Sequence, residues 1–115
     1  MVCPRRMLST TGYIAADKIL SGTVVLELAS VLAGPTAGQF LAELGATVIK
    51  VENTVTKGDV TRTWKVASED KGSDLSSYFS CCNLGKRSIA LNLRNERALD
   101  IVHALAKKSI RMIPS

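Results

Sequence analysis

The feature that most constrains the fold is a pair of apolar runs separated by one predicted helix. The runs are Val24 to Leu28 and Thr47 to Glu52, and their near-continuous apolar character is typical of buried parallel strands. Between them, Pro35 stands where the first turn of a helix tolerates proline, and Gly45 stands where helices commonly end. A strand, a helix and a second strand in this order predict a parallel βαβ unit, and therefore an α/β fold.

The turn between the first run and the helix is the most suggestive place for a ligand. Residues 30 to 35, Ser-Val-Leu-Ala-Gly-Pro, connect the end of the predicted strand to the first turn of the helix. Unpaired backbone N–H groups at a helix N-terminus attract anionic oxygen atoms, especially beside the carboxyl end of a parallel strand. The sequence therefore predicts a place suited to a phosphate-bearing ligand.

A long polar connection leads from this unit to a third strand and a last helix. Residues 53 to 77 are mostly polar and contain the only tryptophan, Trp64, and a short helical turn is expected at Ser77 to Ser80. The alternating pattern of Ser88 to Leu93 predicts the third strand, and Asn95 can cap the helix that follows.

Helical spacing assigns a buried face to each long helix. The expected buried side chains of the first helix are Ala37, Phe40, Leu41 and Leu44. Those of the last helix are Ala98, Ile101, Val102 and Leu105. The only histidine, His103, falls on the opposite face of the last helix, with Asp100 and Lys107. We therefore expect a solvated histidine rather than a catalytic base.

Composition excludes several classes of function. The 115 residues are 46% hydrophobic, which is enough for the core of one modest domain. The aromatic content is only 4% and the basic residues are scattered, so no nucleic-acid partner is expected. No apolar run approaches the roughly 20 residues of a membrane span. The net charge of +5 fits either a basic rim for an anionic small molecule or an ordinary solvated surface.

The cysteines predict neither a disulfide framework nor a metal site. Cys3, Cys81 and Cys82 are odd in number, and two of them are adjacent. There is no C-x-x-C motif and only one histidine, so no metal is expected. With no histidine nearby, Cys81 and Cys82 are expected to be ordinary thiols rather than nucleophiles.

Both ends of the chain are expected to differ from the domain between them. Residues 1–19 lack sustained periodicity and predict a flexible segment, in which arginines, hydroxyl residues and the absence of acidic residues before Asp17 resemble a mitochondrial presequence. A disordered start of a cytoplasmic protein has the same composition, and both locations stay open. Residues 109–115 have a weak apolar pattern and a proline, so we expect a divergent, truncated tail that adds no strand.

Six segments, in order and spacing, resemble the N-terminal part of the class III CoA-transferases. That family includes formyl-CoA, carnitine-CoA and succinate-dependent dicarboxylate CoA-transferases and the related α-methylacyl-CoA racemases. The resemblance covers about residues 20–108. The matching segments are residues 22–28 (GTVVLEL), 31–35 (VLAGP), 41–52 (LAELGATVIKVE), 58–64 (GDVTRTW), 78–79 (YF) and 83–93 (NLGKRSIALNL).

The resemblance implies an incomplete Rossmann-like parallel-sheet domain that binds coenzyme A or acyl-CoA, in a family that forms interlocked homodimers. It implies that the backbone of Val31, Leu32 and Ala33 lies near the nucleotide part of coenzyme A, and that Arg94 contacts a phosphate. An ordinary solvent-facing role for Arg94 stays open. Two family contacts are not carried over, because Ser30 and Asn53 stand where members commonly have basic side chains.

The resemblance also implies that the catalytic aspartate of the family lies beyond the last residue of this chain. Glu52 is expected to be structural, and Asp59 is expected to order its loop through Thr61 or Arg62. The chain alone is therefore expected to be an inactive N-terminal fragment of a CoA-transferase. The alternatives are a non-catalytic module that binds coenzyme A or pairs with a subunit, a racemase fragment, and an unstable product without function.

Overall fold

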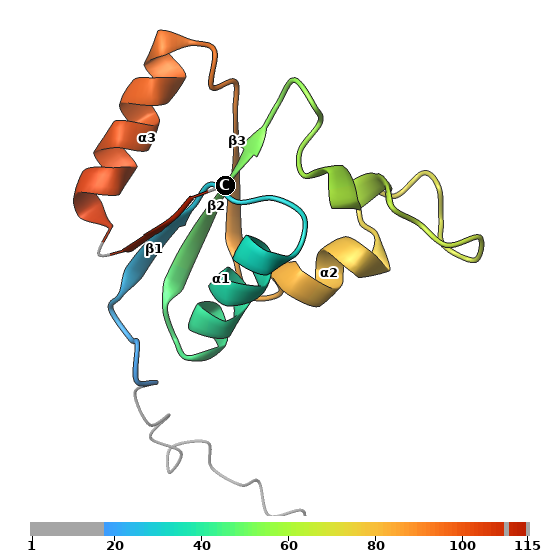
Figure 1. The fold of residues 1–115 in the computed structure, drawn as a ribbon, viewed down its shortest axis with the longest axis horizontal. Coiled ribbons are helices and arrows are strands. Elements are labelled where there is room, and N and C mark those ends of the chain that lie inside the picture. Colours follow the sequence, from blue (N-terminus) through green and yellow to red (C-terminus); the bar gives the residue numbers. More distant parts are fainter. Residues whose placement is uncertain (1–17, 110, 115) are drawn as a thin grey trace, which may run out of the picture.

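A computed structural model describes residues 18–109 and 111–114 and confirms the α/β prediction (Figure 1). Its elements alternate between parallel strands and helices, apart from a short 3-10 helix in the long connection. In chain order they are β1 (Val24–Glu27), α1 (Ala33–Glu43), β2 (Thr47–Asn53), η2 (Val60–Thr63), α2 (Ser77–Asn83), β3 (Arg87–Leu91), α3 (Glu96–Lys108) and β4 (Arg111–Ile113).

The strands form one parallel sheet in the order β3-β2-β1-β4. In its register Val25 lies beside Val48, and Ile89 of β3 lies beside Val51. Helix α3 lies on one side of the sheet, and α1 lies on the other with α2 packed against it (Figure 1). Because all strands run the same way, their carboxyl ends meet at one edge, where the connections to the helices begin.

The expectation that the tail adds no strand was wrong. Three residues, Arg111–Ile113, pair in parallel with β1, and the backbone N–H of Leu28 donates to the carbonyl of Ile113 at 2.9 Å. Strand pairing uses backbone groups, and an open edge of β1 would leave such groups unpaired, so a weak apolar pattern does not prevent it. The rest of the expected tail includes Ile110 and Ser115, which lie outside the described residues, as do residues 1–17 of the N-terminal segment.

The face of the sheet under α3 is apolar. Leu26, Val51 and Val102 form its buried cluster, against which Leu28, Ile49, Ile89, Leu91, Leu105 and Ala106 pack. Asn95 caps α3 as predicted, since its side chain accepts from the backbone N–H of Arg97. Of the predicted stripe, Ala98 and Val102 are buried and Leu105 is half-buried, but Ile101 is 43% exposed. The predicted stripe was therefore too wide by one residue.

Helix α1 covers the other face, and the prediction of its buried side is only partly correct. Leu41 packs against the core and Leu44 is half-buried. Ala37 is exposed and Phe40 is 61% exposed, whereas Gly38 is buried. A Cβ atom at Gly38 would lie 1.8 Å from Glu27 Oε2, and one at Gly34 would lie 2.2 Å from the Cβ of Ala29. The helix also approaches the sheet through glycines, so a pattern based on large apolar residues was wrong for Ala37 and Phe40 and missed Gly34 and Gly38.

The end of α1 follows the sequence prediction. Gly45 has a positive φ of 105°, and its N–H donates to the carbonyl of Ala42 at 2.9 Å. The next N–H, of Ala46, donates to the carbonyl of Leu41 at 3.0 Å. These two bonds form a Schellman motif, in which glycine is favoured because it lacks a Cβ atom.

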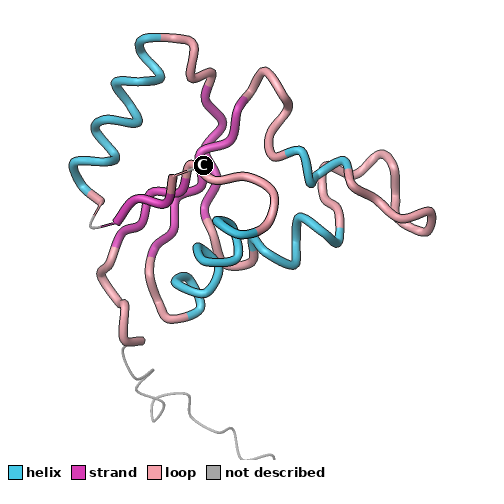
Figure 2. The backbone as a smooth tube through the Cα atoms, viewed as in Figure 1, coloured by secondary structure: helices cyan, strands magenta, loops and turns pink. Residues whose placement is uncertain are grey.

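The polar connection between β2 and α2 extends away from the sheet as a long loop (Figure 2). Ser76 ends it by capping α2, since its side chain accepts from the backbone N–H of Phe79. Trp64 packs edge-on against Tyr78, with ring centroids 5.0 Å apart, so the loop is attached to α2. Within the described part of the chain, no helix has the length and apolar character needed to cross a membrane.

Candidate functional site

The carboxyl edge of the sheet holds a cavity of about 230 Å³. Pockets for whole drug-sized ligands run to about 300–1,000 Å³, so this cavity can hold one group of a larger ligand. It is lined by residues that follow β1 and β3, by the last four residues of β2 and by the start of the long loop. The lining residues are Leu28, Ala29, Ser30, Lys50, Val51, Glu52, Asn53, Thr56, Gly58, Asp59 and Leu93.

The turn that leaves β1 beside this cavity is strained. Val31 has a φ of 70°, in the left-handed region that a β-branched residue rarely adopts. Its backbone N–H donates to Asp59 Oδ1 at 3.4 Å, and its carbonyl accepts from the Cys82 thiol at 3.6 Å. Such a conformation persists only where the surroundings impose it, and it is commonly found at functional sites.

Helix α1 begins immediately after the strained residue, and its start is open. Leu32 occupies the N-cap position, and no side chain caps the helix there. Pro35 has no N–H of its own, so Ala33 and Gly34 carry the first N–H groups of the helix. This end of the helix carries a partial positive charge and favours anionic oxygens.

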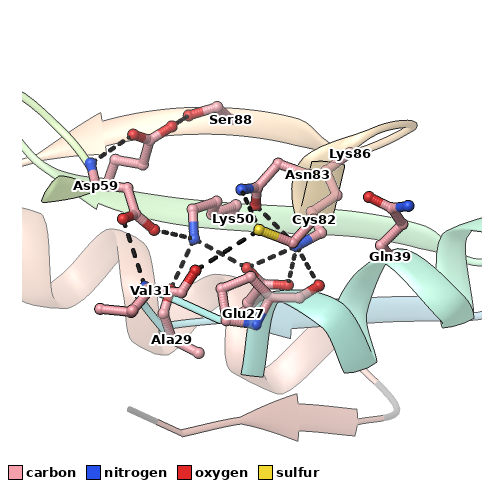
Figure 3. Close-up of polar contacts among 12 residues, drawn as sticks. Glu27, Ala29, Val31, Gln39, Lys50, Asp59, Cys82, Asn83, Lys86 and Ser88 are labelled. Carbon is pink, nitrogen blue, oxygen red and sulfur yellow. Dashed lines mark hydrogen bonds and ion pairs between the residues drawn. The ribbon is translucent and has the colours of Figure 1, made fainter. Parts of the chain in front are cut away.

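A chain of buried charges lies between α1 and the sheet (Figure 3). Lys50 Nζ lies 3.1 Å from Glu27 Oε1 and 3.0 Å from Asp59 Oδ2. On the other side of Glu27, Lys86 Nζ lies 2.9 Å from its Oε2. These four side chains are at most 2% exposed. The contacts link β1, β2, the long loop and the residue before β3 into one polar cluster, which we call the charge chain.

Asp59 accepts hydrogen bonds in addition to its ion pair with Lys50. Its Oδ1 accepts from the backbone N–H of Thr61 at 3.0 Å and from the Thr61 hydroxyl at 2.8 Å. Burial alone would raise the pKa of Asp59, but the bonds from Thr61 and Lys50 outweigh it and lower the pKa. The carboxylate is therefore charged, with Oδ1 in hydrogen bonds and Oδ2 in the ion pair with Lys50. The predicted local role with Thr61 is confirmed, and a contact to β2 is added.

A second polar pair stands next to the charge chain. Arg62 donates to Glu52 through Nε at 2.7 Å and through Nη2 at 2.6 Å, and Ser88 donates to Glu52 at 2.6 Å. Burial would raise the pKa of Glu52, but these bonds and the N–H of Asp59 lower it to about 2. The structural role predicted for Glu52 agrees with this geometry, since neither Glu52 nor Asp59 is free to act as a nucleophile.

The four residues expected at the coenzyme A site flank the cavity without lining it. Val31 is half-buried, whereas Leu32 and Ala33 are exposed at the start of α1. Arg94 is exposed in the turn after β3, next to Leu93 of the cavity wall. The fold thus brings all four to the same edge of the sheet.

The sequence prediction missed most of the polar residues that shape this edge. Glu27, Lys50 and Lys86 had no assigned role, although charged residues inside two buried strands are an unusual signal. Ser30 and Asn53 were set aside as lost family contacts, yet both line the cavity. Their position at or near the carboxyl end of a strand was the signal that could have retained them.

His103, Cys81 and Cys82 lie where the sequence places them, and Cys3 lies outside the described residues. His103 is exposed on α3. Cys81 is exposed and Cys82 is buried, and burial raises the pKa of the Cys82 thiol. A thiol of this kind is a poor nucleophile, so the geometry favours a packing role for Cys82 beside Val31.

Known proteins are similar to this chain in sequence and in fold. A family model described as CoA-transferase family III matches residues 20–109. A succinate–glutarate CoA-transferase of Agrobacterium fabrum is 47% identical over 91 residues, or 76% of this chain and 22% of that protein. A formyl-CoA:oxalate CoA-transferase of Streptomyces coelicolor is 41% identical over 96 residues, or 84% of this chain and 22% of that protein.

A solved structure of a CAIB/BAIF family protein from Brucella suis superimposes with a TM-score of 0.72 at 42% identity. The match covers 84% of this chain and 25% of that one. The chain spans about a fifth of the length of the curated relatives it matches.

Proposed function

The chain belongs to CoA-transferase family III, as its six segments predicted, and from this premise we propose that it forms the coenzyme A side of an acyl-CoA:carboxylate CoA-transferase. Both relatives described above are named as transferases, which favours this activity over the racemase alternative. Their names differ in the carboxylate, succinate and glutarate in one and oxalate in the other. The acyl group is therefore left open.

The observation that carries the proposal is the open start of α1 beside the cavity at the carboxyl edge. Its N–H groups at Ala33 and Gly34 suit a phosphate or pyrophosphate oxygen. The strand order β3-β2-β1-β4 supports a Rossmann-like reading, because doubly wound sheets begin 3-2-1-4 and bind ligands where the order reverses. Here the order reverses at β1, and the turn at Val31 leaves from its carboxyl end.

In this proposal the backbone of Val31, Leu32 and Ala33 contacts the nucleotide part of coenzyme A. Arg94, at the same edge, supplies a guanidinium group to a phosphate. Coenzyme A or acyl-CoA is a substrate here, and no bound cofactor is invoked. By the family resemblance, the complete enzyme is an interlocked homodimer, and the carboxylate that carries the acyl group lies outside this chain.

Calorimetric titration of the purified chain with coenzyme A tests the binding half of the proposal. Circular dichroism with a urea melt first establishes that the chain is folded. We expect weak, saturable heat that diminishes as salt is added, because phosphate contacts are electrostatic. A folded chain that produces no heat at millimolar coenzyme A contradicts the proposal.

An assay with succinyl-CoA and glutarate tests the expected inactivity of the chain alone. We propose this donor and acceptor because of the name of the Agrobacterium relative. The chain should give no turnover above the rate without protein, since its buried carboxylates Glu52 and Asp59 are already paired. Sustained glutaryl-CoA formation by the chain alone contradicts this expectation.

A mitochondrial location is also proposed, from the composition of residues 1–16. Those residues lie outside the described structure. Import of the chain into isolated mitochondria, compared with a chain that begins at Asp17, tests this directly. Exclusion of both chains would favour the cytoplasmic alternative, and equal import of both would show that residues 1–16 are not the import signal.

A further inference from the structure

Burying the charge chain under α1 carries a large desolvation cost. Its members Lys86, Glu27, Lys50 and Asp59 are almost wholly removed from water. Two of its carboxylate oxygens, Glu27 Oε2 and Asp59 Oδ2, make no hydrogen bond of good geometry and interact only as ion pairs. Apolar residues of similar volume often stabilise a fold as well or better, so such a cluster requires a reason other than stability.

The charge chain holds the backbone on both sides of the strained turn. Lys50 Nζ donates to the carbonyl of Ala29 at 2.8 Å, just before the turn. Lys86 Nζ donates to the carbonyl of Pro35 at 2.7 Å, just after it. Between these points, Asp59 accepts the N–H of Val31 itself. Figure 3 shows Lys50, Asp59 and Val31 in this arrangement.

Val31 is the residue that needs such support. Glycine adopts a positive φ without cost, but this position carries a β-branched side chain with a φ of 70°. If the support were removed, the backbone at Val31 would relax towards negative φ. The N–H groups of Ala33 and Gly34 would then change direction, because they follow within three residues.

We propose that Lys50 and Asp59 are positioning residues of the coenzyme A site, which hold the turn at Val31 so that the first N–H groups of α1 face the ligand. The ligand half of this inference rests on the proposed function. The conformational half concerns the free chain and stands without it. Neither residue touches the reacting atoms, and both act through the backbone of residues 29 to 31.

Asp59→Asn tests the inference by removing the negative charge that faces Lys50 while it leaves a side chain of the same size. In an isotope-labelled chain, the coupling between the amide and α protons of Val31, together with its carbon shifts, reports its φ. Without its ion pair with Lys50, the side chain should no longer be held against the turn. We therefore expect Val31 to leave the left-handed region, and the Kd for coenzyme A to rise about tenfold.

Thr61→Val is the matched control. It removes a hydroxyl that donates to the same Asp59 oxygen, in a residue that is 0% exposed, but leaves the contacts of Asp59 with Val31 and Lys50 in place. We expect this variant to lose stability while it keeps the φ of Val31 and the Kd. If it weakens binding as much as Asp59→Asn does, the effect is general destabilisation and the inference is overturned.

Val31→Gly in the Asp59→Asn background provides the rescue, because glycine needs no support at positive φ. Affinity should return towards the original value, or folding should return if Asp59→Asn alone does not fold. Failure of the double variant to recover either property overturns the inference, as does an unchanged Val31 conformation in Asp59→Asn. If the unaltered chain binds no coenzyme A, the proposed function fails, and the φ of Val31 still decides the conformational half.

Discussion

The two faces of the parallel sheet are filled in different ways. The face under α3 is apolar at both ends of its strands, with Leu26 and Val51 at its centre. The face under α1 has its buried apolar cluster, with Val25 and Val48, towards the amino ends of β1 and β2. Towards the carboxyl ends it becomes charged, with Glu27 and Lys50. One face therefore holds the fold together through apolar packing, and the other carries charged groups beside the edge where we propose that coenzyme A binds.

The period of a strand accounts for this division. Successive side chains point to opposite faces, so Leu26 and Glu27 are separated although they are neighbours in sequence. In β2, Lys50 and Glu52 point to one face, and Ile49 and Val51 point to the other. A strand that looks almost wholly apolar can thus carry a polar site on one side.

Leu26→Ala should have the largest effect on stability, because it opens a cavity in the apolar face at a residue that is 0% exposed. We expect a loss of about 4 kcal/mol in the free energy of unfolding. Urea unfolding should give this loss at neutral and at acidic pH alike, since no charge is involved. A loss below about 1 kcal/mol would show that α3 does not depend on this face.

Lys50→Met should cost somewhat less and should depend on pH. The substitution leaves Glu27 and Asp59 facing each other's negative charge without the lysine between them. We expect a loss of about 3 kcal/mol at neutral pH. The loss should shrink as the pH falls, because Lys50 helps to lower the pKa of Asp59, and the stabilisation from that charge is itself lost as Asp59 becomes protonated. Equal losses at neutral and acidic pH would show that the loss of unfolding free energy does not depend on the charges of this face.

The Glu52–Arg62 pair predicts an acid-sensitive contribution. The pKa of Glu52 is lowered from 4.5 to about 2, so its stabilising effect is complete above about pH 4.5 and is lost as the pH falls towards 2. Glu52→Gln should therefore cost about 2 kcal/mol at neutral pH and almost nothing near pH 2. Urea midpoints of both chains across this range measure it, and parallel curves at all pH values would contradict it.

Arg94→Gln should have the smallest effect on stability. The side chain is exposed, so unfolding should change by less than about 0.5 kcal/mol. Binding of coenzyme A should weaken about fivefold, because a charge-assisted bond to a phosphate is lost. Arg97→Gln, at an exposed arginine three residues later on α3, is the control and should change neither property. Equal weakening by both variants would reduce the role of Arg94 to general positive charge.

The sequence predicted the order of elements well because local signals fix it. Pro35 and Gly45 limit α1, and Asn95 caps α3, each through contacts within a few residues. The buried side of α1 was only partly predicted, because Gly34 and Gly38 carry no apolar signal although the helix contacts the sheet through them.

The sequence predicted which turn the candidate site includes, but not the contacts that hold this turn in place. The contact of Asp59 with Lys50 forms only when the long loop folds back onto β2, and no local pattern encodes it. The left-handed conformation of Val31 was also not predictable, because such a conformation is normally inferred from a glycine in the sequence. The strand β4 depends on backbone pairing, which side-chain patterns report poorly.

The most direct measurement of this division of the sheet is an amide-by-amide NMR titration of the chain with coenzyme A. Resonances of Ser30 to Gly34 and of Asn53 to Asp59, at the carboxyl edge beside the charged face, should shift and saturate together. Resonances of the buried α3 face, such as Leu26 and Val102, should stay in place. Shifts confined to α3, or spread evenly over both faces, would contradict a coenzyme A site at the turn that the charge chain holds.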